Sequence, residues 1–156
     1  MKRIGLGLLV GALLFAQDQL PKAEQQELTN ALAEAGGSSH EFIYALEGHL
    51  KKYPETKSRW ELERALVKAS RDIGDDARIV KWGEAVLNRE ADDLQTLELV
   101  TRALVRLGDA ASAEKAIVRG KKWEEVLKSL EPRDGTEKIR WQTRMELDQG
   151  MSRALQ

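Results

Sequence analysis

The residue types that most often bind metals are scarce or poorly spaced in this chain. Its two histidines, His40 and His49, are nine residues apart, which at about 100° per residue places them on opposite faces of one helix. A metal site needs several ligands that converge on one point. We therefore predict no metal ion and interpret His49 as a half-buried packing residue. There is no cysteine, which excludes disulfides, thiolate ligands and a thiol nucleophile.

Paired carboxylates, the usual candidates for acid–base chemistry, stand where helices are expected to begin. The pairs are Asp75-Asp76, Asp92-Asp93 and Glu124-Glu125. Negative charge at a helix N-terminus complements the helix dipole, so we interpret the pairs as structural. No Ser-His-Asp arrangement, phosphate-binding loop or dinucleotide motif is recognisable. The sequence therefore predicts a protein that is not an enzyme, with no catalytic residue and no cofactor.

Tryptophans are the remaining residues that could bind a ligand, by stacking on a sugar or a base. They are Trp60, Trp82, Trp123 and Trp141. They belong to different predicted helices and share no motif. We favour packing between helices, where a large ring contributes much buried area.

The composition is that of a helical protein with balanced charge. The chain has 156 residues, only three prolines and many good helix formers such as Ala, Leu, Glu, Lys and Arg. Lys and Arg number 25 and Asp and Glu 26, so the net charge is -1. That balance gives no electrostatic support for nucleic acid as a partner. We predict an all-α fold.

The first segment has the layout of a secretory signal peptide, which we assign to residues 1–16. Lys2 and Arg3 precede an apolar run from Ile4 to Ala16, and polar residues follow. The run is shorter than the roughly 20 residues that span a bilayer. We expect cleavage near Ala16 and a periplasmic or secreted protein without a stable membrane span; an uncleaved N-terminal anchor is the alternative.

The rest of the chain shows successive amphipathic helices. Ser38 and Ser58 are each followed three residues later by glutamate, the pattern of a capping box. Gly120 either breaks the sixth helix or lets a neighbouring helix pack close. The predicted helices lie at about 21–35, 38–53, 58–73, 75–87, 93–107, 109–120, 123–130 and 136–156.

Helix–turn–helix units recur along the chain. The step from Gly74 to Gly108 is 34 residues, and the step from Gly37 to Gly74 is 37. A period of 34 with two helices per unit is typical of tetratricopeptide repeats. Residues 94–117 resemble that motif in particular. Departures from it include Glu63 at a usually apolar position, Val67 and Thr101 in place of a small glycine, and Ile79 in place of alanine.

The resemblance implies a right-handed solenoid of about three helical hairpins, followed by C-terminal helices. We assign residues 17–131 to this repeat domain and residues 132–156 to a C-terminal helical extension. Each turn glycine would supply a left-handed residue, and small residues would let the paired helices approach. The predicted repeat-packing residues are Gly37, Leu66, Gly74, Leu97, Leu104, Gly108, Ala113 and Ile117.

In tetratricopeptide repeats the first helix of each hairpin lines a concave groove, and by position that groove would be basic here. The predicted groove residues are Arg64, Lys68, Arg71, Arg102 and Arg106. Such a groove would suit an acidic peptide or a C-terminal carboxylate. Lys68 and Arg102 replace the asparagine of the carboxylate-clamp subset, so that clamp is not predicted. The alternative is a solvated face neutralised by acids such as Glu61 and Glu98.

Two classes of function follow from these features. The first is a non-catalytic interaction or scaffold module of the tetratricopeptide type, exported from the cytoplasm, with a protein or peptide as partner. The second is the N-terminal recognition region of a larger secreted enzyme, for example a thioredoxin-like one, whose catalytic domain is absent from these residues. The helix predicted at 136–156 carries apolar residues that need to be covered. It would fold back on the preceding hairpin, continue into a longer natural protein, or mediate self-association.

Overall fold

The computed structural model of this chain describes residues 20–130 together with residues 146 and 150. In this part of the chain all regular structure is helical, which confirms the predicted all-α class. The helices are α2 (Lys22–Glu34), α3 (Ser39–Lys52), α4 (Arg59–Ile73), α5 (Asp76–Leu87), α6 (Leu94–Leu107) and α7 (Ala110–Ser129). None of the described helices is long and apolar enough to cross a membrane. The signal peptide, Trp141 and nearly all of the extension predicted at 132–156 lie outside the described residues.

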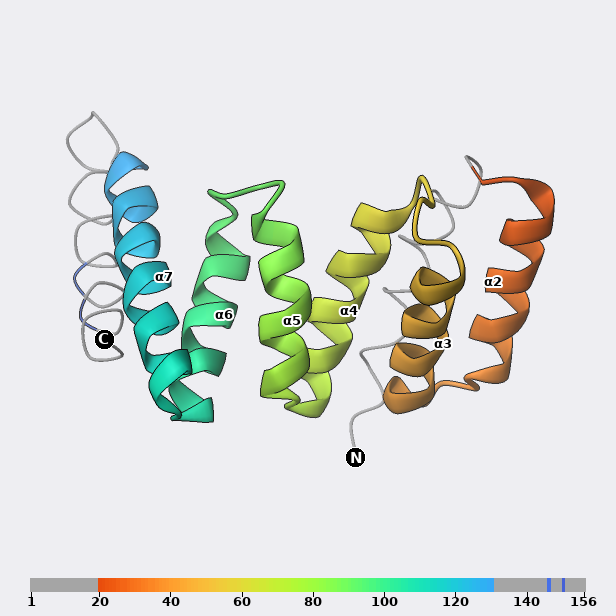
Figure 1. Cartoon of the computed structure of the whole chain (residues 1–156), viewed down its shortest axis with the longest axis horizontal. Coiled ribbons are helices and arrows are strands. Elements are labelled where there is room, and N and C mark those ends of the chain that lie inside the picture. The colour runs from red at the N-terminus through yellow and green to blue at the C-terminus, as the bar shows by residue number, and fades with distance from the viewer. Residues whose placement is uncertain (1–19, 131–145, 147–149, 151–156) are drawn as a thin grey trace. The chain divides into compact units, whose positions relative to one another are not determined.

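The chain divides into two compact units, residues 1–82 and 83–156, with the boundary inside α5. In the first unit, α3 packs against both α2 and α4 (Figure 1). The spacing of apolar residues in α3 and α4 turns one face of each helix toward its neighbour. The large buried apolar side chains of these three helices include Leu28, Phe42, Ile43, Leu46, Leu62 and Leu66.

In the second unit, α6 and α7 pack along each other as a helical hairpin (Figure 1). Leu97, Val100 and Leu104 are buried on α6. The facing side of α7 begins with small residues four apart, Ser112, Ala116 and Gly120, and these let the two backbones approach.

The structure corrects two predictions for α7 and decides between the two alternatives that the sequence left open at Gly120. Ala113 and Ile117, predicted as packing residues, are exposed, because the buried face of α7 runs through the residue that precedes each of them. The helix is continuous through the buried Gly120 and is not broken there. Glu124-Glu125 consequently lies inside α7 rather than at a helix start.

Side-chain caps explain most of the helix starts. Ser38 accepts a hydrogen bond from the Glu41 backbone N–H at 3.4 Å. Asp93 and Asp109 cap α6 and α7 in the same way, each with a 2.9 Å bond. The capping box predicted at Ser58 is wrong: its ψ of 13° is not the extended conformation of a capping residue, and it makes no side-chain cap bond.

The turn glycines behave as predicted. Gly37, Gly74 and Gly108 have φ angles of 89°, 72° and 70°. This left-handed region is costly for a residue with a Cβ atom, so glycine is the residue that ends each helix without strain. Leu66, Leu97 and Leu104 are fully buried, in agreement with their predicted packing role.

Candidate functional site

One side of α4 carries three of the five predicted groove residues. The buried residues of this helix are Leu62, Glu63, Ala65, Leu66, Val67, Ala69 and Ser70. The accessible side holds Trp60, Arg64, Lys68 and Arg71, which at 100° per residue lie within an arc of about 80°. We call these four residues the α4 strip.

The contacts of the α4 strip hold its cations at the surface. The Arg64 guanidinium carbon lies 4.9 Å from the centre of the Trp60 ring, within the range of a cation–π contact. Arg71 forms an exposed ion pair with Asp72 at 3.0 Å. Lys68 makes no ion pair with any residue that the structure describes. Exposed pairs such as Arg71–Asp72 contribute little energy, so they compete only weakly with a ligand.

A buried carboxylate fixes the first turn of α4, next to the strip. Glu63 is 2% exposed and accepts a 2.8 Å hydrogen bond from Arg59 Nε. The same Arg59 donates to the Pro54 carbonyl oxygen at 2.7 Å. A buried charge must be paired to be tolerated, which accounts for glutamate at a position where the repeat motif has an apolar residue.

The other two predicted groove residues lie on α6, in the second unit. Arg102 Nε donates to Glu98 at 2.9 Å, and its guanidinium carbon is 5.9 Å from the ring of the buried Trp123. Arg106 is exposed near the C-terminal end of α6. The structure thus places Arg64, Lys68 and Arg71 on one side of α4. In α6, Arg102 donates a hydrogen bond to the neighbouring acid Glu98.

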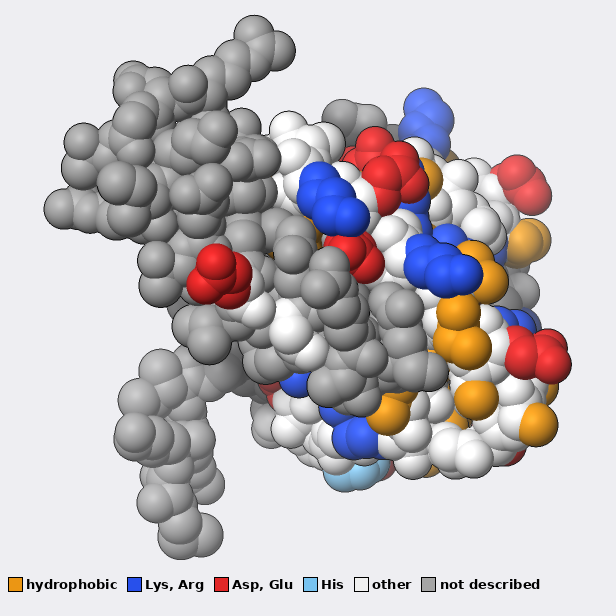
Figure 2. Space-filling model, turned by 90° about the vertical axis from the view of Figure 1, so that its left-hand side faces the viewer, with side chains coloured by type: hydrophobic (Ala, Val, Ile, Leu, Met, Phe, Trp, Pro, Cys, Tyr) orange, Lys and Arg blue, Asp and Glu red, His pale blue; other side chains and the backbone are white. Residues whose placement is uncertain are grey.

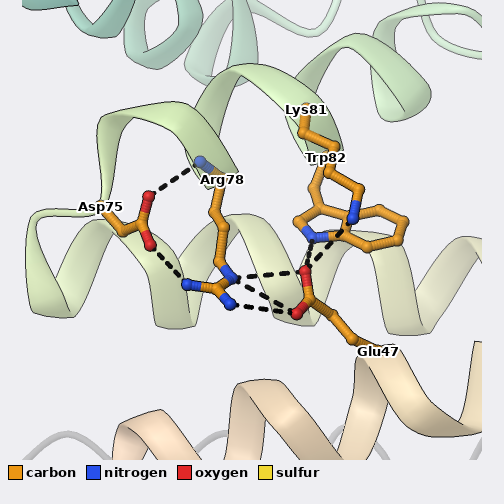
Figure 3. A network of polar contacts seen from close by, with 5 residues as sticks. All are labelled: Glu47, Asp75, Arg78, Lys81 and Trp82. Atoms are coloured by element: carbon orange, nitrogen blue, oxygen red, sulfur yellow. Dashed lines mark hydrogen bonds and ion pairs between the residues drawn. The ribbon is translucent and has the colours of Figure 1, made fainter.

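Sequence reasoning missed a polar network between α3 and α5 in the first unit (Figure 3). The Glu47 carboxylate accepts hydrogen bonds from Arg78 Nη2 at 3.2 Å and from Trp82 Nε1 at 3.0 Å. Lys81 Nζ lies 3.3 Å from the same carboxylate. Asp75 holds Arg78 from the other side at 2.7 Å. One glutamate therefore binds three residues of α5, Arg78, Lys81 and Trp82, and ties α3 to α5.

The carboxyl groups of this network have lowered pKa values. Partial burial raises the pKa of Glu47, but hydrogen bonds from Arg78 and Trp82 and the charge of Lys81 outweigh it, so the pKa lies below its ordinary value. The backbone N–H of Arg78 is the main cause of the lowered pKa of Asp75. Glu47 raises the pKa of the Arg78 guanidinium further. Glu47, Asp75 and Arg78 are therefore charged at neutral pH.

The position of Glu47 recurs in the sequence, and this was the signal that could have revealed the network. Glu47 lies ten residues after Gly37, and Glu84 lies ten residues after Gly74. In the second unit, Glu84 likewise accepts hydrogen bonds from an arginine of α7, Arg119. Each glutamate therefore links one α-helix to a helix about 35 residues further along the chain.

A second polar cluster joins α2 to α3. His49 is 6% exposed, more buried than predicted, and its Nε2 lies 3.1 Å from Oε1 of the buried Glu24. Glu27 accepts hydrogen bonds from Lys52 and from the Tyr53 hydroxyl, which together lower the pKa of Glu27. A hollow of about 340 Å³ lies beside this cluster. Two lysines and two glutamates line it, so its charge favours neither sign of ligand.

The tryptophans divide between packing and surface roles. Trp123 is 2% exposed and packs as predicted, and Trp82 is buried with its N–H bonded to Glu47. Trp60 remains partly accessible on α4. His40 is exposed whereas His49 is buried, which agrees with their predicted placement on opposite faces. Among the described residues no group of histidines and carboxylates is arranged to hold a metal ion.

Charge on the surface is mixed rather than of one sign. Figure 2 shows a face on which Lys and Arg side chains lie beside Asp and Glu side chains. The α4 strip places three cations in consecutive turns of one helix in a chain whose net charge is -1. Comparison of this chain with protein-family models, with curated proteins and with solved structures finds no match.

Proposed function

We propose that this chain is a non-catalytic interaction module that binds acidic, extended peptide segments through the α4 strip. The observation that carries this proposal is the composition of the accessible side of α4. Among the residues of α4 that are not buried, one aromatic ring and three cations lie within an arc of about 80°, whereas Arg59, Glu61, Asp72 and Ile73 lie outside that arc. Aromatic and arginine side chains on one surface are the residue types that most often dominate protein interfaces.

The energetics of the strip fit recognition better than a purely structural role. An ion pair that stabilises the fold would have a buried or geometrically fixed partner, as Glu63 has in Arg59. The strip side chains are partly accessible or exposed, so binding of a carboxylate requires little desolvation of the protein beforehand. Arginine and lysine together can pair with two carboxylates of one peptide.

The proposal includes the architecture and the location expected from the sequence. The hairpins would form a short tetratricopeptide-like array, in which α4 is the first helix of its repeat. The layout of residues 1–16 supports export to the periplasm or beyond. The partner would then be an exported protein or peptide with an acidic segment.

Charge reversal on α4 tests the proposed function. Arg64→Glu combined with Lys68→Glu should weaken the binding of a fluorescein-labelled Asp-rich peptide about tenfold in anisotropy titrations, because two attractive contacts become repulsive. The matched control is Lys115→Glu with Lys121→Glu, which changes the net charge equally at two exposed positions of α7. Equal weakening by both pairs would show that only net charge matters and would refute the α4 site.

A further inference from the structure

We infer that α3 binds a second copy of this chain in an antiparallel helix pair, through Glu41, Tyr44, Gly48 and Lys51. We call these four residues the α3 stripe. All four are exposed, on a helix whose buried residues pack against α2 and α4. The inference concerns a different helix from the α4 strip and does not depend on the function proposed above.

Gly48 is the first sign of a close approach from outside the chain. Glycine is among the least favourable residues in a helix interior, and the glycines inside α5 and α7 are explained by packing within the chain. A Cβ atom at Gly83 would lie 2.3 Å from Val100, and Gly120 is buried. A Cβ atom at Gly48 meets nothing within 4 Å. A glycine on an exposed helix face lets a second backbone come close.

Tyr44, one turn before Gly48, provides the ring that such an approach would cover. It is 55% exposed, and the guanidinium carbon of Arg78 lies 5.3 Å from the centre of its ring. Arg78 is itself held by Glu47 and Asp75 (Figure 3). An accessible tyrosine beside a fixed neighbour offers a large contact area at a small cost in side-chain entropy.

The spacing of the α3 stripe sets the geometry of the pair. Its members follow one another at steps of three, four and three residues, which is the spacing of the seam along which two helices pack at about 20°. A two-fold axis makes every contact occur twice. With the axis midway between Tyr44 and Gly48, the ring of Tyr44 faces the partner's Gly48, where no side chain competes for the space.

The same axis brings opposite charges together, and this favours a second copy as the partner. Glu41 lies three residues before Tyr44, and Lys51 lies three residues after Gly48, so Glu41 faces the partner's Lys51 at both ends of the pair. Neither Glu41 nor Lys51 forms an ion pair within residues 20–130. A parallel pair would place like charges opposite each other, so charge also selects the antiparallel direction.

Sedimentation velocity of the full chain over a range of concentrations tests this inference. The stripe covers only about three helical turns, so we expect a weak dimer with a dissociation constant of about 100 µM. Glu41→Lys and Lys51→Glu should each weaken it about tenfold, because each creates two repulsive pairs. An equimolar mixture of these two variants should dimerise again, since every facing pair in the heterodimer has opposite charges.

Matched controls separate the stripe from net charge and from folding. Glu114→Lys and Lys115→Glu change the net charge equally at exposed positions of α7, and each should dimerise like the parent chain. Gly48→Gln places a side chain where the partner's Tyr44 would lie and should weaken the dimer about tenfold or more. Its thermal stability at low concentration should not fall, because glutamine favours a helix more than glycine does.

Three results would overturn the inference. The first is a parent chain that remains monomeric up to about 1 mM, well above the expected dissociation constant. The second is a dimer that survives Gly48→Gln and both charge reversals on α3, because it would then form through another surface. The third is a mixture of Glu41→Lys and Lys51→Glu that stays monomeric, since the antiparallel register requires these two charges to face each other.

Discussion

The accessible sides of α4 and α6 carry different charges at several equivalent positions, and the first of these is Arg64 in α4 against Glu98 in α6. Arg64 and Glu98 are 34 residues apart, as are Lys68 and Arg102, and the same step separates the turn glycines Gly74 and Gly108. In α4 the first position is a cation that lies over Trp60. In α6 it is an acid that accepts a hydrogen bond from Arg102. Helical spacing alone therefore predicts which side chains share a face, whereas the charge that the face presents depends on single neighbours.

Two helical glycines, Gly83 of α5 and the exposed Gly48 of α3, differ in their surroundings, and this difference gives the largest expected effect. A Cβ atom added at Gly83 would lie 2.3 Å from Cγ2 of Val100 on α6, whereas one added at Gly48 on α3 meets nothing within 4 Å. Gly83→Ala should lower the free energy of unfolding by about 1–3 kcal/mol through overpacking. Gly48→Ala should raise it by about 0.5–1 kcal/mol through helix propensity.

Urea denaturation followed by circular dichroism measures both substitutions. Because both exchange a helical glycine for alanine, their backbone contributions are alike and the difference reports the contact with Val100. A Gly83→Ala protein as stable as the Gly48→Ala protein would contradict the close approach of α5 and α6 within the second unit.

The equivalent glutamates of the two units provide the second prediction. Glu47 accepts from Arg78 and Trp82 and lies beside Lys81, whereas Glu84 pairs with Arg119. At pH 7, Glu47→Gln should cost about 1–2 kcal/mol of unfolding free energy, since charge-assisted hydrogen bonds are lost. Glu84→Gln should cost less, because one arginine rather than three groups depends on it.

The pH dependence of that cost has a definite sign. The pKa of Glu47 is lowered in the folded protein, so its stabilising contribution is complete above the ordinary glutamate pKa of about 4.3 and is lost as the pH falls through the lower folded value. The gap in stability between the parent protein and Glu47→Gln should therefore shrink between pH 7 and about pH 3. A gap that stays constant over this range would show that the carboxylate charge does not hold the network.

Local signals in the sequence were sufficient for most helices and turns. Gly74 and Gly108 mark turns because the left-handed region is specific to glycine, and Asp93 and Asp109 mark starts because a cap is a local contact. The cap predicted at Ser58 was wrong, since the backbone of Ser58 does not have the extended conformation that a capping residue needs. The packing role predicted for Ala113 was wrong by one residue, because the buried residue is Ser112. A shift of one residue rotates a helix face by about 100°, and only packing against α6 determines which face is buried.

The sequence predicted those parts of the candidate site that depend on local spacing and missed those that depend on distant partners. Arg64, Lys68 and Arg71 share a face by spacing alone, which needs no tertiary information. The roles of Glu47 and Glu24 could not be assigned, because their donors are 25 to 35 residues away and any of several cations could have been the partner. Recurrence of a glutamate ten residues after successive turn glycines was the one available signal.

The smallest expected effect comes from giving α6 the charge pattern of α4. Glu98→Arg would add a cation one turn before Arg102 and Arg106, at a cost of less than about 1 kcal/mol from the lost pair and from repulsion between cations four residues apart. If charge at this position distinguishes the two helices, Glu98→Arg in the Arg64→Glu, Lys68→Glu background should restore part of the affinity for the Asp-rich peptide, about fivefold. Glu98→Gln, which removes the acid without adding a cation, should restore less. Anisotropy titrations in the same buffer measure all three proteins. In α6 the residue equivalent to Trp60 is Leu94, so an arginine at position 98 would have no indole to contact. If Glu98→Arg restores no affinity, binding of the acidic peptide requires the contact between Arg64 and Trp60 in addition to charge.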